Sequence, residues 1–335
     1  MALLEIENLH VSYRTPQGEA VAVDGVSLAL EEGDYLGLVG ESGCGKSTIA
    51  KAILGILPQA ARVAGSLRFA GRELIGLSVI ELRRIRWRDI ALIPQNAMNG
   101  FDPVYTIEKQ LDEAIAAHAD LPAGARRERI AALFAMVGLS PDRLKDYAHQ
   151  FSGGMRQRAM IAMALALDPK LIVADEPTTG LDVIIQDQIL ERIAEIHATA
   201  GNAMLLITHD MAVVSENCDR IAVMYAGRIM EIGGTDVFLS PLHPYTMGLC
   251  NAFPDAARRE GELISIPGTP PSLVDPPSGC RFHTRCPFAT ARCTDEVPPL
   301  IEISRGHFAA CHHADRAPEF RDQARDPATW RTATP

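Results

Sequence analysis

Apolar and polar residues alternate along the first thirty positions of the chain. The apolar positions are Leu4, Ile6, Leu9 and Val11, followed by Val21, Val23, Val26, Leu28 and Leu30. Alternation of this kind is typical of strands that bury one face. Residues 15–18 contain proline and glycine between the two runs, which favours a turn. We therefore expect short strands joined by a turn within residues 3–30.

A second pattern consists of short apolar runs. They lie at residues 35–39, 90–93, 171–174 and 203–208, and residues 64–69 form a further strand-like segment. Strands that are apolar on both faces suit a parallel sheet with both faces covered. Residues 221–224 and 228–232 lie on either side of Ala226 and Gly227, which predicts a hairpin.

Helical periodicity occupies most of the intervals between these runs. The helical segments are residues 49–57, 73–87 and 107–167, the last with breaks near 122–124 and 138–141. Residues 96–106 have the composition of a loop. The second segment ends in Arg83, Arg84, Arg86 and Arg88, which we interpret as a solvated face. The long third segment indicates a helical insertion into an α/β fold.

Residues 40–48 read GESGCGKST and lie between an apolar strand and a helix, which is the context of a phosphate-binding P-loop. Glycines let backbone N–H groups surround an anion, and the helix N-terminus adds partial positive charge. We expect Lys46 to reach the β- and γ-phosphates and the Ser47 hydroxyl to bind Mg²⁺. The predicted nucleotide-binding residues of this loop are Gly40, Glu41, Ser42, Gly43, Cys44, Gly45, Lys46, Ser47 and Thr48.

Further candidate residues stand at the ends of predicted elements. Ser152 is placed to cap a helix whose first N–H groups would face an anion. Asp175 and Glu176 end a buried strand, where Asp175 suits Mg²⁺ binding and Glu176 suits a base or orienter for an attacking water. His209 follows the strand at 203–208, and we expect it to face the γ-phosphate.

Composition excludes several classes of protein. The chain has 335 residues, 47% hydrophobic and 22% charged, which is enough for one large domain and a smaller one. The net charge of −10 argues against a nucleic-acid partner. No apolar run approaches the length of a membrane span, and the first residues lack the basic start of a signal peptide. We therefore expect a cytosolic chain whose seven cysteines form no disulfides.

Four cysteines crowd into the last quarter of the chain, namely Cys280, Cys286, Cys293 and Cys311. Residues 261–300 contain eight prolines, so this segment is not mainly helical and does not hold itself by core burial alone. Clustered thiols in a cytosolic chain suggest metal ligation. Structural zinc sites favour closer pairs of cysteines, so zinc, with His283, His307 or His312 replacing a thiol, and unligated thiols both stay open.

The motifs resemble those of the ATPase subunits of ATP-binding-cassette (ABC) transporters, in the same order, across residues 3 to about 235. Lys46 and Ser47 match the Walker A motif, and Gln95 matches the Q-loop. Residues 151–155 (FSGGM) match the signature motif, and residues 171–176 (LIVADE) match Walker B. Residues 180–182 match the D-loop, and His209 matches the switch histidine. Tyr13 is similar to the aromatic residue that stacks on adenine. The signature departs from the common LSGGQ at its ends but keeps Ser152, Gly153 and Gly154, which would touch phosphate.

This resemblance implies a P-loop NTPase fold, with a RecA-like core, a β-subdomain and a helical insertion. Two such domains close head to tail, and each ATP lies between one chain's P-loop and the other's signature motif. Hydrolysis transfers the terminal phosphoryl group to water. The catalytic residues would be Glu176, His209 and Gln95, and the Mg²⁺ ligands Ser47, Gln95 and Asp175.

The tail beyond Ser240 resembles the dipeptide, oligopeptide and nickel importer branch, through SPLHPYTMGL, IPGTPPSL, GCRFHTRCPFATARC and AACHH. The branch implies an ABC domain over 1–240 with a helical subdomain at about 96–167, and a C-terminal extension over 241–335. It points to a [4Fe–4S] cluster on the four cysteines. Residues 97–103 follow the general pattern of the branch without naming a solute.

The branch also implies partners: two membrane-spanning permease subunits, a second ATPase that is a paralogue or a copy, and a solute-binding protein. The loop after Gln95 and the helical insertion would dock on the permease. The chain would act at the cytoplasmic face of the inner membrane, where ATP hydrolysis energises the import of peptides or related small solutes.

Two other function classes fit less well. ABC ATPases of DNA repair carry long coiled coils between Walker A and the signature, and this interval has no sustained heptads. Those that act in translation carry two cassettes in one chain. A purely structural metalloprotein with a vestigial nucleotide fold would not need the complete set of motifs.

Overall fold

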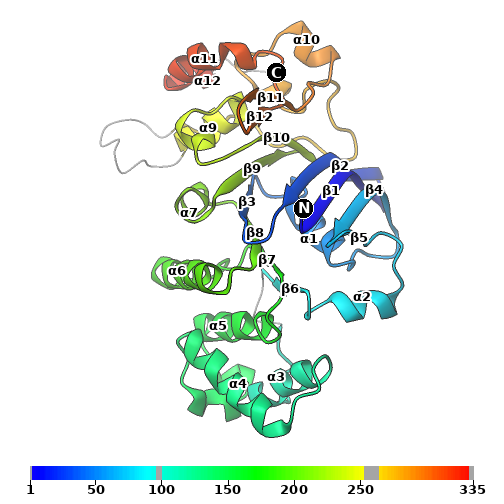
Figure 1. The fold of residues 1–335 in the computed structure, drawn as a ribbon. Helices are drawn as coiled ribbons and strands as arrows, with labels where there is room; N and C mark the ends of the chain where they lie inside the picture. Colours follow the sequence, from blue (N-terminus) through cyan, green and yellow to red (C-terminus); the bar gives the residue numbers. More distant parts are fainter. Residues whose placement is uncertain (1, 96–99, 253–263, 332–335) are drawn as a thin grey trace. The chain divides into compact units, whose positions relative to one another are not determined.

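The computed structural model describes residues 2–95, 100–252 and 264–331 (Figure 1). The chain divides into two compact units. The helical unit comprises residues 31–35 and 76–207, and the P-loop unit comprises residues 2–30, 36–75 and the chain from 208 onward. The loop predicted at 96–106, the branch pattern at 97–103 and the start of the helical subdomain include residues 96–99, which lie outside the described residues.

An antiparallel sheet forms the first part of the P-loop unit. Its strands are β1 (Leu4–Thr15), β2 (Gly18–Leu30), β4 (Ala61–Phe69) and β5 (Arg72–Glu73), in the order β2-β1-β4-β5. Leu4 pairs with Leu30 and Thr15 with Gly18, so the predicted turn joins two strands that are longer than expected. Leu4, Ile6, Leu9 and Val11 are all buried. Register shifts after Ile6 and after Leu9 explain why the alternation is imperfect.

The second group of strands in the P-loop unit holds the predicted hairpin. In spatial order these strands are β11 (Ile301–Ser304), β12 (His307–Ala309), β10 (Arg228–Gly233), β9 (Arg220–Tyr225) and β3 (Tyr35–Val39). Strands β9 and β10 form the hairpin, and β3 pairs with β9 in parallel. The helices of this unit are α1 (Lys46–Ile53), α7 (Met211–Asn217), α8 (Asp236–Leu239), α9 (Pro244–Ala252), α10 (Ala291–Asp295), α11 (Ala317–Ala324) and α12 (Pro327–Arg331).

The C-terminal region, which is the part of the P-loop unit from residue 241 onward, packs around its own small core. Helices α9 and α11 lie side by side, with α12 next to α11 (Figure 1). The Asn251 amide donates to the Ala324 carbonyl at 2.8 Å, and the indole N–H of the buried Trp330 donates to the same oxygen at 2.9 Å. Between residues 264 and 290 the only helical turn is the 3₁₀ segment His283–Arg285, which confirms that the proline-rich segment is not mainly helical.

A buried ion pair joins β10 to β12 within this region. Glu231, which is fully buried, lies 2.7 Å from Nε2 of His307 and accepts from the backbone N–H groups of Leu242 and His243. Asp236 lies 3.1 Å from the other ring nitrogen of His307. Burial alone would lower the pKa of His307, but the hydrogen bonds and charges of Glu231 and Asp236 raise it. Both nitrogens of His307 are thereby engaged away from the cysteines.

The helical unit contains three parallel strands in the order β8-β7-β6. They are β8 (Ala203–Thr208), β7 (Leu171–Asp175) and β6 (Ile90–Ile93). Every residue of β7 and β8 is buried, as the continuous apolar runs predicted. Its helices are α2 (Val79–Ile85), α3 (Ile107–Ala116), α4 (Ala123–Met136), α5 (Gly153–Ala164) and α6 (Val183–Ala200), with 3₁₀ turns Pro141–Lys145 and Ala148–Gln150. The helical insertion and its two predicted breaks are confirmed.

The helix predicted over residues 73–87 is wrong at its start. Glu73 belongs to β5, and its carboxylate accepts from the Ser66 hydroxyl and from two backbone N–H groups. The helix begins only at Val79, because Ser78 caps it through a reciprocal pair of hydrogen bonds with Glu81. Helical periodicity alone does not reveal a carboxylate that is already committed to a neighbouring strand.

One helix, α1, begins earlier than its apolar pattern over residues 49–57 indicated. Helix α1 starts at Lys46 inside the P-loop and ends at Ile53, and α5 starts at Gly153 and ends at Ala164. Helix α1 starts directly after the glycines of the P-loop, whereas the two glycines of the signature are the first residues of α5. Within the described ranges, no helix is both long enough and apolar enough to cross a bilayer.

Candidate nucleotide site and cysteine cluster

The P-loop connects β3 to α1 and packs tightly against neighbouring backbone. A Cβ atom on Gly40 would lie 2.0 Å from the Met224 carbonyl oxygen, and one on Gly45 would lie 2.1 Å from the Ala22 carbonyl oxygen. Both residues also have φ in the left-handed region, at 153° and 113°. Only glycine satisfies both conditions at these two positions.

No side chain caps the backbone N–H groups in the first turn of α1, because the N-cap residue is Gly45. Such N–H groups, together with the helix dipole, form an anion site. Lys46 is almost fully buried, and its ammonium group donates to the Gly40 carbonyl at 2.7 Å and to the Glu41 carbonyl at 3.1 Å. The cation therefore lies inside the loop that we predict to bind phosphate.

Cys44 lies in the same loop. Burial raises the pKa of its thiol despite the nearby Lys46 ammonium, so the thiol is protonated at neutral pH. A protonated thiol is a poor nucleophile, so we interpret Cys44 as a small loop residue.

Tyr13 and His209 are the other P-loop-unit residues predicted to contact the nucleotide. The Tyr13 hydroxyl lies 3.3 Å from the Thr48 hydroxyl, so this β1 side chain reaches the start of α1. His209 is exposed and follows β8, and the next residue, Asp210, caps α7 by accepting from the backbone N–H groups of Ala212 and Val213. Their contacts with base and phosphate stay predictions.

In the helical unit, two of the predicted catalytic side chains are in direct contact. The Gln95 amide, which comes just after β6, donates to the Glu176 carboxylate at 2.8 Å. The contact exists because β6 and β7 are parallel neighbours, so their carboxyl ends lie at the same edge. Asp175 is the buried last residue of β7. Glu176 has a φ of 47°, an uncommon conformation for a residue with a side chain.

Thr179 is a member of this group that sequence reasoning missed. Its hydroxyl donates to the same Glu176 oxygen at 3.0 Å. Thr179 lies in the turn after Walker B, where a threonine gives no signal of its own. Glu176 is therefore oriented by two side-chain donors and by its own backbone N–H, which donates to Ile207.

The signature segment begins α5 in the manner predicted. The Ser152 hydroxyl accepts from the Met155 backbone N–H at 3.3 Å, which confirms the cap. Ser152 is exposed, whereas Gly154 is buried and a Cβ there would lie 2.7 Å from Ile185. Asp182 caps the neighbouring α6 by accepting from the Ile185 N–H at 3.1 Å.

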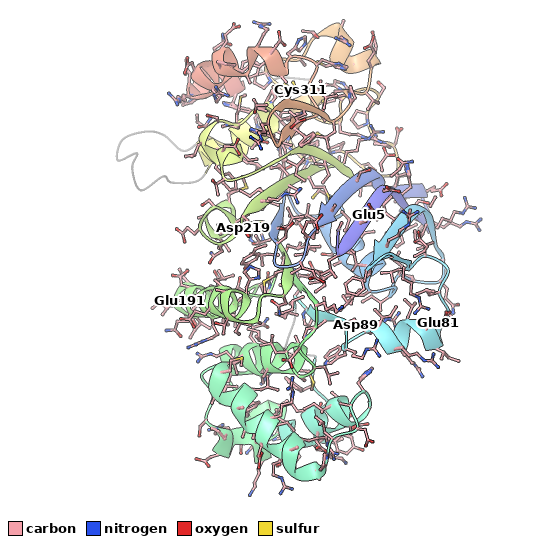
Figure 2. All side chains as sticks on the ribbon, in the orientation of Figure 1. Glu5, Glu81, Asp89, Glu191, Asp219 and Cys311 are labelled. Atoms are coloured by element: carbon pink, nitrogen blue, oxygen red, sulfur yellow. The ribbon has the colours of Figure 1, made fainter. Side chains whose placement is uncertain are left out.

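The four C-terminal cysteines surround one small hollow. Its lining includes Cys280, Cys286, Cys293 and Cys311 together with His243, Pro244, Phe282, His283, Phe288, His312, His313 and Phe320. The Cys280 backbone N–H donates to the Cys293 carbonyl at 2.8 Å, and Cys311 follows β12 (Figure 2). All seven cysteines of the chain are free in this structure.

Burial and mutual repulsion raise the pKa of three of these thiols. Burial raises the pKa of Cys280 to about 11 and that of Cys311 to about 12, and neighbouring thiolate charges add to both shifts. For Cys286, burial and the other three thiols raise the pKa well above its ordinary value. Without a cation these three thiols are therefore protonated near neutrality, and metal binding would release their protons.

A single metal ion needs several ligating side chains close together. Among the described residues, no three side chains of His, Cys, Asp or Glu are gathered closely enough to hold one ion. Two of the histidines proposed as substitute zinc ligands each use one ring nitrogen on a backbone carbonyl: Nδ1 of His283 contacts the Cys280 carbonyl at 2.9 Å, and Nε2 of His312 contacts the Glu296 carbonyl at 2.9 Å.

Two residues of the C-terminal region that sequence reasoning missed contact the P-loop. Arg285 forms a two-pronged ion pair with the Glu41 carboxylate, at 2.6 and 3.0 Å. The Tyr245 hydroxyl accepts from the Glu41 backbone N–H at 3.0 Å. Since more than two hundred positions separate these partners, no local pattern could have revealed them.

The sequence matches two known protein families. Residues 23–179 match the family described as "ABC transporter", and residues 230–293 match "Oligopeptide/dipeptide transporter, C-terminal region". The second match ends at Cys293 and so includes three of the four clustered cysteines.

Curated relatives match over almost the whole chain. A probable peptide ABC transporter ATP-binding protein of Sinorhizobium fredii is 46% identical, over 92% of this chain and 94% of its own length. The dipeptide transport ATP-binding protein DppD of Bacillus subtilis is 45% identical, over 95% of this chain and 96% of its own. The oligopeptide transport ATP-binding protein OppD of Escherichia coli is 43% identical, over 92% and 93%.

Solved structures match the nucleotide-binding part. The ATP-binding cassette MJ0796, in a dimeric post-hydrolysis state bound to ADP and phosphate, is 26% identical with a TM-score of 0.62. The match covers 69% of this chain and 98% of that one. A second dimeric structure of the same cassette gives a TM-score of 0.63.

Proposed function

The chain belongs to the ATP-binding proteins of ABC transporters that carry an oligopeptide/dipeptide transporter C-terminal region, and we propose that it energises the import of peptides or related small solutes. It is an ATPase that works with a membrane permease. The relatives named for dipeptide and oligopeptide transport support the solute class. The branch resemblance also implies carriers of nickel, opines and oligosaccharides, and the recovery experiment below distinguishes among these solutes.

The observation that carries the ATPase assignment is the pairing of Gln95 with Glu176 in the helical unit, alongside a P-loop that only glycine can form. A carboxylate held by the Gln95 and Thr179 donors has one defined orientation. A base must be oriented before it can direct a water molecule at a phosphorus atom. We assign Glu176 to this role and Gln95 and His209 to positioning the water and the γ-phosphate.

Binding is assigned to the P-loop and to the signature motif. Residues 40–48 supply backbone N–H groups and the Lys46 ammonium, and Tyr13 supplies a face for adenine. Ser152, Gly153 and Gly154 begin α5, whose N-terminal N–H groups would meet the ATP of a partner cassette. We assign Mg²⁺ to Ser47, Asp175 and Gln95, where the ion would neutralise phosphate charge.

A cleft in the helical unit is our candidate for the permease contact. It has a volume of about 860 Å³ and is lined by Ile80, Arg83, Arg84, Arg86, Trp87, Asp102, Tyr105, Gln110, Glu113, Ala114, Ala117, His118 and Met163. Arg83 and Arg84 are exposed, as predicted, and Val79 and Ile80 beside them are about two-thirds exposed. A mixed basic and apolar surface of this kind suits a short cytoplasmic helix of a permease.

The proposed assembly contains two permease subunits, a second ATPase and a solute-binding protein that acts through the permease. This chain would lie at the cytoplasmic face of the inner membrane, held there by the permease. The second ATPase is a paralogue in our proposal, since the branch often pairs two different ATPases. The solved structures of a dimeric cassette support a pair of ATPases, and the head-to-tail arrangement is part of our proposal.

The proposal is tested by recovering the tagged chain from its native membranes in mild detergent and identifying its partners by mass spectrometry. We expect two multi-span permeases and a second ATPase. A solute-binding protein that is also recovered would identify the ligand to test for ATPase stimulation. Recovery of ribosomal or DNA-repair proteins without a permease would contradict the transporter assignment.

For the four cysteines we propose a [4Fe–4S] cluster. The proposal is supported by the four thiols that surround one hollow, since such a cluster takes one thiolate at each of its irons. When bound, the cluster would cross-link the segment from Cys280 to Cys311 and could respond to redox conditions. ATP hydrolysis does not require it.

We expect anaerobically purified protein to contain about four iron and four sulfide per chain and no zinc. Cys286→Ser should lose the iron and lower the thermal stability, because one cross-link is removed. Cys250→Ser is the matched control, since Cys250 lies on α9 outside the lining of the hollow. Wild-type protein that is folded but free of metal would rule out both iron–sulfur and zinc.

A further inference from the structure

Glu41, the second residue of the P-loop, is held through three of its groups. Its backbone N–H donates to the Tyr245 hydroxyl at 3.0 Å, and its carbonyl accepts from the Lys46 ammonium at 3.1 Å. Its carboxylate pairs with Arg285 through two parallel hydrogen bonds of 2.6 and 3.0 Å. Two of these three anchors come from the C-terminal region.

Arg285 has one defined position, because all five of its N–H donors are engaged. Two N–H groups donate to the Glu41 carboxylate. The other three donate to the Tyr225 hydroxyl at 3.2 Å, the Pro267 carbonyl at 2.8 Å and the Ile266 carbonyl at 3.3 Å. Its side chain is only 6% exposed. A planar guanidinium with no free donor in a buried site fixes the direction from which it reaches the carboxylate.

Aromatic packing fixes the Tyr245 hydroxyl in the same way. The Tyr245 ring lies 4.6 Å from that of Tyr225 and 5.2 Å from that of Phe282, measured between centroids. Tyr225 ends β9, the strand that pairs with β3, and β3 leads directly into the P-loop. Both anchors of Glu41 are therefore built on a rigid support next to the loop.

A P-loop gains affinity when its N–H groups are already arranged for phosphate. Gly40, Gly43 and Gly45 all have positive φ, and glycine loses more conformational freedom on ordering than any other residue. A contact that orders the loop in advance removes part of this entropic cost from the binding step.

We propose that Arg285 and Tyr245 are positioning residues of the nucleotide site, which anchor Glu41 so that the C-terminal region preorganises the P-loop for the triphosphate. The inference rests on the proposed function, since it concerns the same site. The C-terminal region then contributes to nucleotide binding by the ATPase.

The same geometry links the cysteine cluster to the P-loop. Arg285 directly precedes Cys286 and lies in a turn that begins at Cys280. Within this turn, the N–H groups of His283, Arg285 and Cys286 donate to the carbonyls of Cys280, Phe282 and His283, respectively. The turn that carries two of the four thiols thus also presents the arginine that holds Glu41.

The test measures the affinity of the full-length chain for a non-hydrolysable ATP analogue with Mg²⁺, by isothermal titration. We expect Arg285→Ala and Tyr245→Phe each to weaken binding roughly tenfold, because the loop is no longer ordered in advance. In the purified transporter, the KM for ATP should rise by a similar factor while kcat at saturating ATP changes less than twofold.

Arg281→Ala is the matched control. Arg281 is a largely covered arginine of the same segment, with a side chain 11% exposed, but its partner is Asp24 at 2.7 Å and not the P-loop. Its removal should lower thermal stability without changing nucleotide affinity. Equal loss of affinity in Arg281→Ala and Arg285→Ala would overturn the inference, because the effect would then be one of general stability.

A double-mutant cycle isolates the contact itself. If Arg285 acts through Glu41, the Glu41→Ala/Arg285→Ala double variant should bind nucleotide no more weakly than the weaker single variant. If Arg285→Ala does not fold, the nucleotide affinity of Tyr245→Phe tests the positioning role, since this variant removes one hydroxyl and keeps the ring packing. Affinity within twofold of wild type in folded Tyr245→Phe and Arg285→Ala would refute the positioning role. A wild-type chain that binds no nucleotide would instead refute the proposed function.

Discussion

Replacing Glu176 with glutamine should lower ATP turnover by about 10²- to 10⁴-fold, the range that a positioned base contributes. The amide has nearly the same shape as the carboxylate but does not accept a proton from the attacking water. The P-loop, which provides most of the assigned binding contacts, is unchanged. The measurement is phosphate release by the purified transporter, together with equilibrium binding of ATP to the same variant.

The matched control for this variant is Glu191→Gln. Glu191 is an exposed carboxylate on α6 (Figure 2), so its neutralisation should leave turnover unchanged. We expect Glu176→Gln to retain ATP and to trap it in the closed dimer. If this variant hydrolyses ATP at the wild-type rate, Glu176 does not have the assigned role.

Replacing Lys46 with alanine should weaken ATP binding by roughly 10- to 100-fold, because hydrogen bonds from a cation to phosphate are lost in a site where water is largely excluded. The buried ammonium also holds the Gly40 and Glu41 carbonyls, so the loop itself would lose an internal contact. Equilibrium titration with ATP and Mg²⁺ gives the affinity, and a thermal melt separates it from any loss of stability.

Lys51→Ala is the control for Lys46→Ala. Lys51 lies on the same short helix and is exposed, so its removal should leave ATP affinity within about twofold of wild type at physiological salt, where surface charges are screened. Unchanged affinity in Lys46→Ala would contradict the assignment of the P-loop as the phosphate site.

Most of the candidate site was predictable because its signals are local. Gly40 and Gly45 need conformations that only glycine adopts in such close packing, and Ser152 caps the helix that it directly precedes. The continuous apolar runs of β7 and β8 predicted buried strands, since every residue of both strands is buried. Such features depend on a few neighbouring residues, and a sequence displays those directly.

Predictions were less accurate where a residue had a distant partner. Residues 73–87 were predicted as one helix, but the Glu73 carboxylate is committed to Ser66 and β4 and the helix begins after Ser78. His307, weighed as a zinc ligand, is instead part of a buried ion pair with Glu231. In both cases the side chain's partner, and not its local pattern, decides the outcome.

The sequence by itself determined the type of fold, the P-loop, the order of the motifs and the spacing of the four cysteines. Only the tertiary structure decided which of these residues meet. It brings Gln95 to Glu176 because two parallel strands end at one edge, and it brings Arg285 and Tyr245 to Glu41 across 244 and 204 positions. The physical reason is that backbone conformation and burial follow from short-range chemistry, whereas a hydrogen bond between distant side chains exists only after the chain has packed.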